Sequence, residues 1–455
     1  MVKTSPASSA RLLLPLLLCC FLLSVKICVA TGTADGSEQW GYVEVRPKAH
    51  LFWWRYRSPQ RIENGSTPWP TVLWLQGGPG ASGVGIGNFQ EIGPLDADLK
   101  PRKSTWLQKA DLLFVDNPVG TGFSYVEDES LFVRTDVEAA VDLTTLLKKL
   151  YGENESWRNS PLFIVAESYG GKYAVTVALT IVEAIKAGEL KLNFGGVALG
   201  DSWISPEDFV ASLHGLFALL TSQFLVQTVI FLPPLFCCVM QFSWGPLLRD
   251  VSRLDIKDDF YNFLLDLGND PISLTAVQQS EKLTMKAYST YLSSKASSSA
   301  DISSLMNGVI REKLKIIPKT VSWGSQSDDV FNSLSSDFMR PRIREVDELL
   351  SLGINVTIYN GQVDLICATK GTEAWVQKLK WEGLKDFNSI DRTPCTTEEP
   401  GVTKGFLKSY KNLHFYWILG AGHFVPVDQP CLSQDDRWHY PVSCCFFLLE
   451  DEVVP

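Results

Sequence analysis

The sequence predicts an α/β fold with a mostly parallel central sheet and helices on both faces. Short runs of apolar and β-branched residues recur along the chain, at 71–76, 111–116, 162–166, 196–199, 355–359 and 414–419. These runs are apolar on both faces, which is typical of strands covered by helices on either side. Stretches with apolar residues at helical spacing separate some of the runs, and that alternation favours parallel pairing.

The predicted helices and turns indicate where the chemistry lies. One helix is predicted at 135–151 and another at 169–187, directly after Ser168. Several predicted strands end in turns rich in glycine or proline, such as 77–83 (GGPGASG) and 420–423 (GAGH). Functional groups of open α/β sheets gather at the carboxyl ends of the strands, so we expect the site at these turns. Residues 205–318 lack the strand rhythm and are predicted to form a mainly helical lid insertion.

The bulk composition is that of a globular protein. The 455 residues are 45% hydrophobic and 20% charged, and the formal net charge is −10. Because Lys and Arg form no block, nucleic acid is not expected as a partner. No cysteine spacing matches a zinc site, and we expect neither a metal nor a cofactor. The sequence does not indicate an oligomeric state.

The first 30 residues are predicted to be a secretory signal peptide. Lys3 and Arg11 precede an apolar run at 12–23, and small residues end the segment at Ala30. This is the order of a positive start, an apolar stretch and a cleavage site. The alternative is an uncleaved membrane anchor, but the apolar run is short for a span. We therefore expect secretory-pathway entry, with the cell exterior, the vacuole or the lysosome as destination.

A secretory route permits glycans and disulfides. Glycosylation sequons place acceptor asparagines at Asn64, Asn154 and Asn355, of which Asn355 lies inside a strand-like run. Ten cysteines occur, and three of them lie in the predicted signal peptide. Seven then remain, an odd number, so at least one is free or pairs between chains.

The strongest local motif surrounds Ser168. The sequence 166–171 (AESYGG) follows a predicted strand and precedes a predicted helix. This is the setting of a nucleophile elbow, in which small residues two positions before and after the serine, here Ala166 and Gly170, prevent clashes. The alternative is a serine that caps an ordinary strand-to-helix turn.

A serine nucleophile needs a base, and the base needs a group that orients it. Of five histidines, only His423 closes a glycine-rich turn directly after a predicted strand, and Asp364 occupies a similar position after another strand. The chain order Ser168, Asp364, His423 is the order of α/β-hydrolases. We therefore predict that these three residues form a catalytic triad.

Together these segments resemble the serine carboxypeptidase family (peptidase S10), most closely its retinoid-inducible and plant serine carboxypeptidase-like branch. The resemblance covers most of 40–210 and 243–432 and rests on WLQGGPGASG (74–83), DNPVGTGFSY (116–125), ESYGGKYA (167–174), YNGQVDLIC (359–367) and GAGHFVPVDQP (420–430). It implies an α/β-hydrolase fold and a serine-type carboxypeptidase that cleaves the C-terminal residue of peptides.

The resemblance also assigns roles to individual residues. Backbone amides of Gly78 and Tyr169 would form the oxyanion hole. The terminal carboxylate of the substrate would be bound by Gln76, Gly77, Glu91 and Glu167, although family members usually carry Asn where this chain has Gln76. Cys367 would be a free thiol near the substrate pocket, and Cys395 could pair with Cys431.

The two glutamates carry a physical consequence. Two adjacent carboxylates do not both ionise cheaply, so one pKa rises and the pair shares a proton. A protonated pair can donate a hydrogen bond to a substrate carboxylate, which favours acidic pH. Alternatives are an acyltransferase that uses the same triad on a small acyl substrate, and an inactive or binding form.

Two segments depart from the family pattern. Residues 212–242 are strongly apolar, and 433–455 show no clear helical period. A membrane span at 212–242 would put Ser168 on the opposite side from Asp364 and His423, so no stable span is expected. We expect one domain at 31–432, with 212–242 as an atypical part of the lid insertion and 433–455 as an atypical tail.

Overall fold

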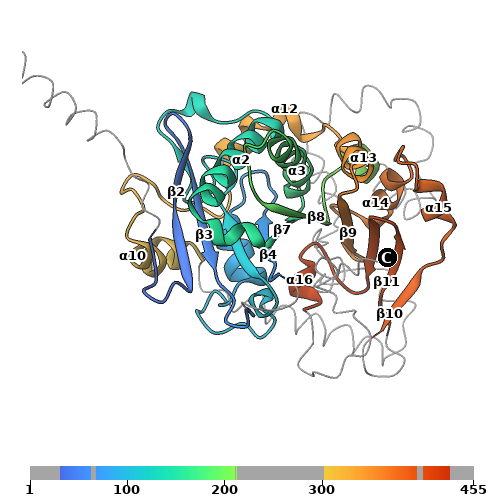
Figure 1. Ribbon diagram of the computed structural model, residues 1–455, viewed down its shortest axis with the longest axis horizontal. Coiled ribbons are helices and arrows are strands. Elements are labelled where there is room, and N and C mark those ends of the chain that lie inside the picture. The colour runs from blue at the N-terminus through green and yellow to red at the C-terminus, as the bar shows by residue number, and fades with distance from the viewer. Residues whose placement is uncertain (1–30, 63–67, 211, 213–301, 397–402, 431–455) are drawn as a thin grey trace, which may run out of the picture.

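The structure is a computed structural model that describes residues 31–62, 68–210, 212, 302–396 and 403–430 (Figure 1). The predicted signal peptide 1–30, the sequon residue Asn64, residues 213–242 of the apolar segment and the tail 433–455 lie outside these residues. The predicted domain and lid boundaries therefore stay predictions. Within the described ranges, no helix is both long enough and apolar enough to cross a bilayer.

The described strands form one sheet of 12 strands in the order β1-β2-β3-β5-β4-β7-β8-β9-β12-β11-β10, with β6 paired to β3. Figure 1 shows this sheet running from β2 on one side of the molecule to β10 on the other. The strands are β1 (Thr31–Gly32), β2 (Glu38–Arg46), β3 (Ala49–Tyr56), β4 (Thr71–Leu75), β5 (Asp111–Val115), β6 (Tyr125–Val126), β7 (Pro161–Glu167), β8 (Asn193–Gly200), β9 (Asn355–Gly361), β10 (Thr393–Thr396), β11 (Thr403–Tyr410) and β12 (Leu413–Ile418).

The six apolar runs predicted as buried strands are the six central strands, and they pair in parallel from β5 to β12. The central prediction is therefore confirmed. The outer strands pair antiparallel, so the sheet as a whole is mixed. The reason is local, because β2 meets β3 and β11 meets β12 through connections of two residues, which only antiparallel neighbours can use.

Helices cover both faces of the sheet, as predicted. Alternate residues of β4 show how, because Leu73 and Leu75 pack into one core while Val72 and Trp74 pack into the other. The first core includes side chains from α2 (Asp136–Glu153), α3 (Gly170–Lys186), α13 (Ile343–Ser351) and α14 (Thr369–Val376), and the second includes side chains from η1 (Gly83–Ile92), α10 (Arg311–Leu314) and α16 (Val425–Asp428). The sheet is thus the middle layer of three.

The helices expected at 135–151 and 169–187 are α2 and α3. Thr135 caps α2, since its hydroxyl accepts the Glu138 N–H at 3.2 Å. The α-helices are α2 (Asp136–Glu153), α3 (Gly170–Lys186), α9 (Ile302–Leu305), α10 (Arg311–Leu314), α11 (Asp328–Ser333), α12 (Ser335–Phe338), α13 (Ile343–Ser351), α14 (Thr369–Val376), α15 (Leu384–Ser389) and α16 (Val425–Asp428). The π-helices are η1 (Gly83–Ile92) and η6 (Met306–Ile310). The 3₁₀-helices are η2 (Trp106–Gln108), η3 (Glu129–Leu131) and η4 (Glu155–Asn159).

A buried ionic cluster fastens α12 to the helix that follows Ser168. Lys172 of α3 and Asp337 of α12 are both fully buried, and their Nζ and Oδ2 atoms lie 2.8 Å apart. Arg342 also reaches Asp337, at 3.3 Å, and forms an ion pair with Asp136 of α2. Charged groups are buried in this way only as ion pairs, because an unpaired buried charge destabilises the folded state.

Replacing Lys172 therefore tests how firmly this cluster holds the fold. We expect Lys172→Met to lower the free energy of unfolding by about 3–5 kcal/mol, because it leaves Asp337 buried without its ammonium partner. Lys186→Met, in the exposed last turn of the same helix, is the matched control and should change it by less than about 0.5 kcal/mol. Denaturant unfolding measures both values, and equal stability of the two variants would contradict the prediction.

Candidate active site

Four neighbouring parallel strands, β7, β8, β9 and β12, end at the same edge of the sheet. Ser168 follows β7, Asp201 follows β8, Asp364 lies shortly after β9, and His423 follows β12. Their backbones are joined, because the Asp201 N–H donates to Tyr359 and the Val363 N–H donates to Ala421. The predicted residues far apart in the chain thus share one edge.

Ser168 occupies a tight turn between β7 and α3. Its φ is +59°, in the left-handed region that a serine rarely adopts. The turn is held by hydrogen bonds, since the Ser168 N–H donates to the carbonyls of Gly200 and Asp201 at 3.2 and 3.1 Å. The Trp203 N–H donates to the Ser168 carbonyl at 2.8 Å. A strained conformation fixed from both sides is the local geometry of a nucleophile elbow.

Glycines allow the end of β4 to press against this turn. A Cβ on Gly77 would lie 2.5 Å from the Ser168 Cβ and 2.8 Å from the Tyr169 backbone nitrogen. A Cβ on Gly170 would lie 2.3 Å from the Leu75 carbonyl oxygen. Both positions are therefore restricted to glycine by contact, which is the reason for the small residue expected after Ser168.

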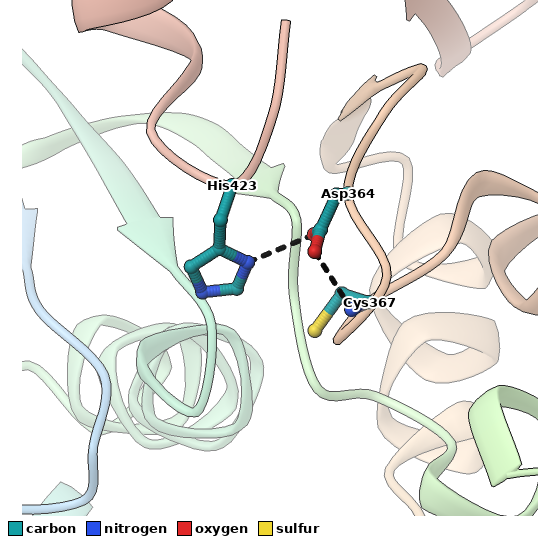
Figure 2. Close-up of side chains that lie close together, drawn as sticks. All are labelled: Asp364, Cys367 and His423. Atoms are coloured by element: carbon teal, nitrogen blue, oxygen red, sulfur yellow. Dashed lines mark hydrogen bonds and ion pairs between the residues drawn. The ribbon is translucent and has the colours of Figure 1, made fainter. Parts of the chain in front are cut away.

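His423 and Asp364 form a buried hydrogen-bonded pair. Figure 2 shows the imidazole pointing at the carboxylate, with 2.8 Å between Nδ1 and Oδ2. The side chains are almost inaccessible, at 3% exposure for His423 and none for Asp364. The other oxygen of Asp364 accepts the N–H groups of Ile366 and Cys367 at 2.8 and 3.2 Å. The carboxylate is thus fixed in orientation, and it selects the imidazole tautomer with a proton on Nδ1.

The thiol of Cys367 lies beside this pair. The ligand atoms of Asp364, Cys367 and His423 all lie within 4.8 Å of one another, so these residues have the composition of a metal site (Figure 2). The fit is poor, because a metal on Nδ1 would displace the hydrogen bond to Asp364. Burial, followed by the charge of Asp364, raises the pKa of Cys367 well above its usual value, so the thiol stays protonated.

Two backbone N–H groups lie next to the Ser168 turn. Gly78, with φ +107°, directly follows the glycine that touches Ser168, and Tyr169 directly follows Ser168. Neither N–H donates a hydrogen bond to any acceptor in the part of the chain that the structure describes. The Tyr169 side chain is anchored away from the turn, since its hydroxyl donates to Asp337 at 2.7 Å. Two unengaged amides of this kind suit a negatively charged oxygen.

Glu91 and Glu167 form a buried pair of carboxyl groups, each 1% exposed. The Gln76 side chain connects to this pair, because its Nε2 donates to Glu167 at 2.7 Å while its Oε1 accepts from Trp74 at 2.7 Å. Both oxygens of Glu91 and the second oxygen of Glu167 are buried with no donor among the described residues. The two carboxyl groups are within hydrogen-bonding reach of each other, and that bond needs a proton on one of them.

The environment raises the pKa of both glutamates. Burial is the main cause for Glu91, whose pKa rises to about 7. Burial, and then the charge of Glu91, raise the pKa of Glu167 well above its usual value. The pair therefore keeps at least one proton below neutral pH, so one acid can donate while the other accepts.

One buried acid at this edge was not predicted from the sequence. Asp201 is fully buried, and its Oδ1 accepts from Asn360 Nδ2 and the Gly361 N–H, both at 2.9 Å. Its carboxyl group lies beside that of Asp364, and burial, followed by the charge of Asp364, raises its pKa well above the usual value. A detectable signal did exist, since Asp201 directly follows the predicted strand 196–199 and Gly200.

The remaining predicted residues lie apart from this site. Asn154 ends α2, and its Nδ2 donates to the Leu150 carbonyl at 2.8 Å, while Asn355 is the first residue of β9. Their glycosylation stays a prediction. Cys395 lies in β10, and Cys431 lies outside the described residues, so their pairing also stays a prediction.

The fold and the geometry of this edge define an α/β-hydrolase. The family profile for serine carboxypeptidases (peptidase S10) matches residues 29–232 and 233–435. The chain is 54% identical to serine carboxypeptidase-like 51 of Arabidopsis thaliana, over 88% of this chain and 91% of that protein. It is 44% identical to the human retinoid-inducible serine carboxypeptidase, over 94% of this chain and 96% of that protein.

The chain therefore belongs to the serine carboxypeptidase family and is a serine-type carboxypeptidase, a hydrolase that acts on peptides. A solved prohormone-processing carboxypeptidase from Saccharomyces cerevisiae superposes with a TM-score of 0.63 at 21% identity, covering 86% of this chain and 88% of that one. At that identity the superposition supports the fold alone.

The contact between Gly77 and the Ser168 turn yields a test of the site. We expect Gly77→Ala to lower kcat/KM on a blocked dipeptide by about 100-fold, because the new methyl displaces backbone atoms by a fraction of an ångström or more. Labelling by a serine-directed phosphonate should slow in parallel. Gly152→Ala is the matched control, since a Cβ there meets nothing within 4 Å. Activity of Gly77→Ala within twofold of the parent would contradict the prediction.

Proposed function

We propose that this chain removes the C-terminal residue of peptides through an acyl-enzyme formed on Ser168, with His423 as base and Asp364 as its orienting partner. Three observations support the triad. Ser168 sits on a strained strand-to-helix turn, His423 and Asp364 are hydrogen-bonded at 2.8 Å, and all three residues lie at one sheet edge.

The proposed reaction has two halves. Ser168 Oγ attacks the carbonyl carbon of the last peptide bond while His423 Nε2 takes the hydroxyl proton. The resulting oxyanion accepts hydrogen bonds from the backbone N–H groups of Gly78 and Tyr169. The C–N bond then breaks, and the imidazolium returns the proton to the departing amino acid. Water attacks the ester with His423 again as base, which releases the shortened peptide and restores Ser168.

The observation that carries the preference for a terminal carboxylate is the position of the Glu91–Glu167 pair. Glu167 directly precedes Ser168, so the pair lies one residue from the proposed nucleophile. A carboxyl pair that shares a proton donates to a substrate carboxylate instead of repelling it. Gln76 and the Gly77 backbone border the same place, and we propose that they complete this subsite.

We also propose entry into the secretory pathway, with signal removal near Ala30 and glycans on Asn64, Asn154 and Asn355. Residues 1–30 support this, because positively charged residues at their start are followed by an apolar run at 12–23. The cell exterior, the vacuole and the lysosome are the destinations compatible with it.

Removing the proposed nucleophile tests the mechanism. Ser168→Ala should lower kcat on a blocked dipeptide by about 10⁴-fold or more and abolish covalent labelling by a phosphonate, because no acyl-enzyme can form. Ser130→Ala, at an exposed serine in η3, is the control and should retain full activity. Product analysis with and without an alcohol acceptor separates hydrolysis from acyl transfer. Retained labelling in Ser168→Ala would refute the proposed nucleophile.

The shared proton predicts a specific pH dependence. Because the pKa of Glu91 is raised to about 7 and that of Glu167 is also raised, the pair is fully protonated in acid and begins to lose its protons as pH rises through neutrality. KM for a peptide should therefore increase by about tenfold per pH unit above that pKa, while KM for the matching peptide amide stays flat.

A variant separates this effect from general alkaline loss. Glu167→Gln cannot form the ionised pair, so its KM for the peptide acid should rise less steeply than that of the parent. Glu183→Gln, at an exposed position on α3, should reproduce the parent profile. An unchanged alkaline rise in Glu167→Gln would show that the carboxyl pair does not bind the substrate carboxylate.

A further inference from the structure

The buried Asp201 joins the turn that carries Ser168 to the loop that carries Asp364. Its backbone carbonyl accepts the Ser168 N–H at 3.1 Å, and its own N–H donates to the Tyr359 carbonyl of β9 at 3.0 Å. Its φ of +38° lies in the left-handed region, so the chain accepts backbone strain here. Asp201 is thus fully buried, has a strained backbone and is hydrogen-bonded both to the Ser168 turn and to β9, which leads to the Asp364 loop.

One oxygen of Asp201 closes the base of the Asp364 loop. Oδ1 accepts both the Asn360 side-chain amide and the Gly361 N–H at 2.9 Å. Asn360 Nδ2 also donates to the Cys367 carbonyl at 2.6 Å. Because Asn360 and Cys367 stand on either side of Asp364, these bonds close the loop into a ring with Asp364 inside it.

The Asp201 carboxyl group lies beside that of Asp364. Oδ2 is buried with no donor among the described residues, so this oxygen is available for a proton shared with the neighbouring Asp364 carboxyl group. Two carboxyl groups can bond only if one carries the proton, and Asp364 already accepts from His423, Ile366 and Cys367. Asp201 is therefore the donor of the two.

The charges around Asp201 favour the same assignment. Burial, and then the charge of Asp364 and the bond to it, raise the pKa of Asp201 well above its usual value. The other acids that influence it or that it influences are Asp428 in α16 and Glu167 at the end of β7, with Tyr359 and Cys367 as neutral neighbours. No cation appears among these groups, so the neutral acid is the stable form.

We propose that Asp201 is a positioning residue for the proposed triad: Oδ1 fixes the loop around Asp364, and the proton on Oδ2 holds the Asp364 carboxylate in line with His423. The proposal rests on the proposed function of Ser168, Asp364 and His423. It assigns Asp201 no contact with substrate, since its carboxyl group is enclosed by Asn360, Gly361 and Asp364.

Asparagine and glycine at position 201 differ in the hydrogen bonds they can replace, so the two variants test the proposed role of the Asp201 carboxyl group. Asparagine keeps one acceptor for Asn360 and Gly361 and one N–H donor for Asp364, whereas glycine removes both while adopting a positive φ without strain. We expect Asp201→Gly to lower kcat on a blocked dipeptide by about 100-fold, with KM within about threefold because the Glu91–Glu167 pair is untouched. Asp201→Asn should retain more than about a tenth of the parent kcat.

The pH profile of kcat separates positioning from a charge effect. If Asp201 is a neutral donor, the profile of Asp201→Asn superimposes on that of the parent, whereas loss of a charged neighbour would displace it. Asp142→Gly is the matched control, since Asp142 of α2 is also a buried acid but is ion-paired to Arg46 at the end of β2. It should lower stability without changing kcat.

Each outcome decides between the proposals. Asp201→Gly with kcat within twofold of the parent, Asp201→Asn as impaired as Asp201→Gly, or a displaced Asp201→Asn profile would overturn the role of Asp201. If Asp201→Gly does not fold, Asn360→Ala carries the test, because it removes the amide that closes the ring and should lower kcat with little change in KM. Activity retained by Ser168→Ala would instead overturn the proposed function itself.

Discussion

Parallel pairing of β7, β8, β9 and β12 is the constraint on which the rest of the structure depends. Parallel neighbours end on the same side of a sheet, so the residue that follows each strand is brought beside the residue that follows the next. Ser168, Asp201, Asp364 and His423 are separated by up to 255 positions in the chain, and only this register places them at one edge. The helices on both faces bury the sheet and thereby keep that register fixed.

Acid groups crowd this edge more closely than stability alone would favour. The Glu91–Glu167 pair and the Asp201–Asp364 pair are both buried, and in each pair burial and the neighbouring carboxyl group raise the pKa of at least one member. Burial, and then the charges of Glu167, Asp201 and Glu91, raise the pKa of Tyr359 well above its usual value. Burying carboxyl groups costs free energy, and such groups concentrate where function requires them. A shared proton leaves each pair with one negative charge instead of two, which lowers the cost of burying it without a lysine or arginine partner.

The sequence predicted the buried centre of the fold better than its margins. The six central strands are apolar on both faces, and that pattern is readable without coordinates. The antiparallel margins were not predicted, because β2 and β11 are only half-buried and their apolar pattern is weaker. Within the site, His423 and Asp364 could be predicted because each follows a strand in a turn that contains glycine. Asp201 also follows a strand, but the role proposed for it depends on its proximity to Asp364, which the local sequence pattern does not contain.

Close contact between successive loops explains why glycine recurs after these strands. A Cβ on Gly200 would lie 2.2 Å from the Tyr359 ring, so the end of β8 can approach β9 only without a side chain. A Cβ on Gly361 would lie 2.1 Å from the Gly422 carbonyl oxygen, so the same holds between the loops of Asp364 and His423. The contact of Gly77 with the Ser168 turn extends this series to β4. Because interiors are packed to near-crystalline density, a displacement at one of these contacts is passed to the next loop instead of being absorbed. The geometry of the proposed triad is therefore a property of the whole row of strand ends, which is why Asp201, at the centre of that row, can position groups on both sides of it.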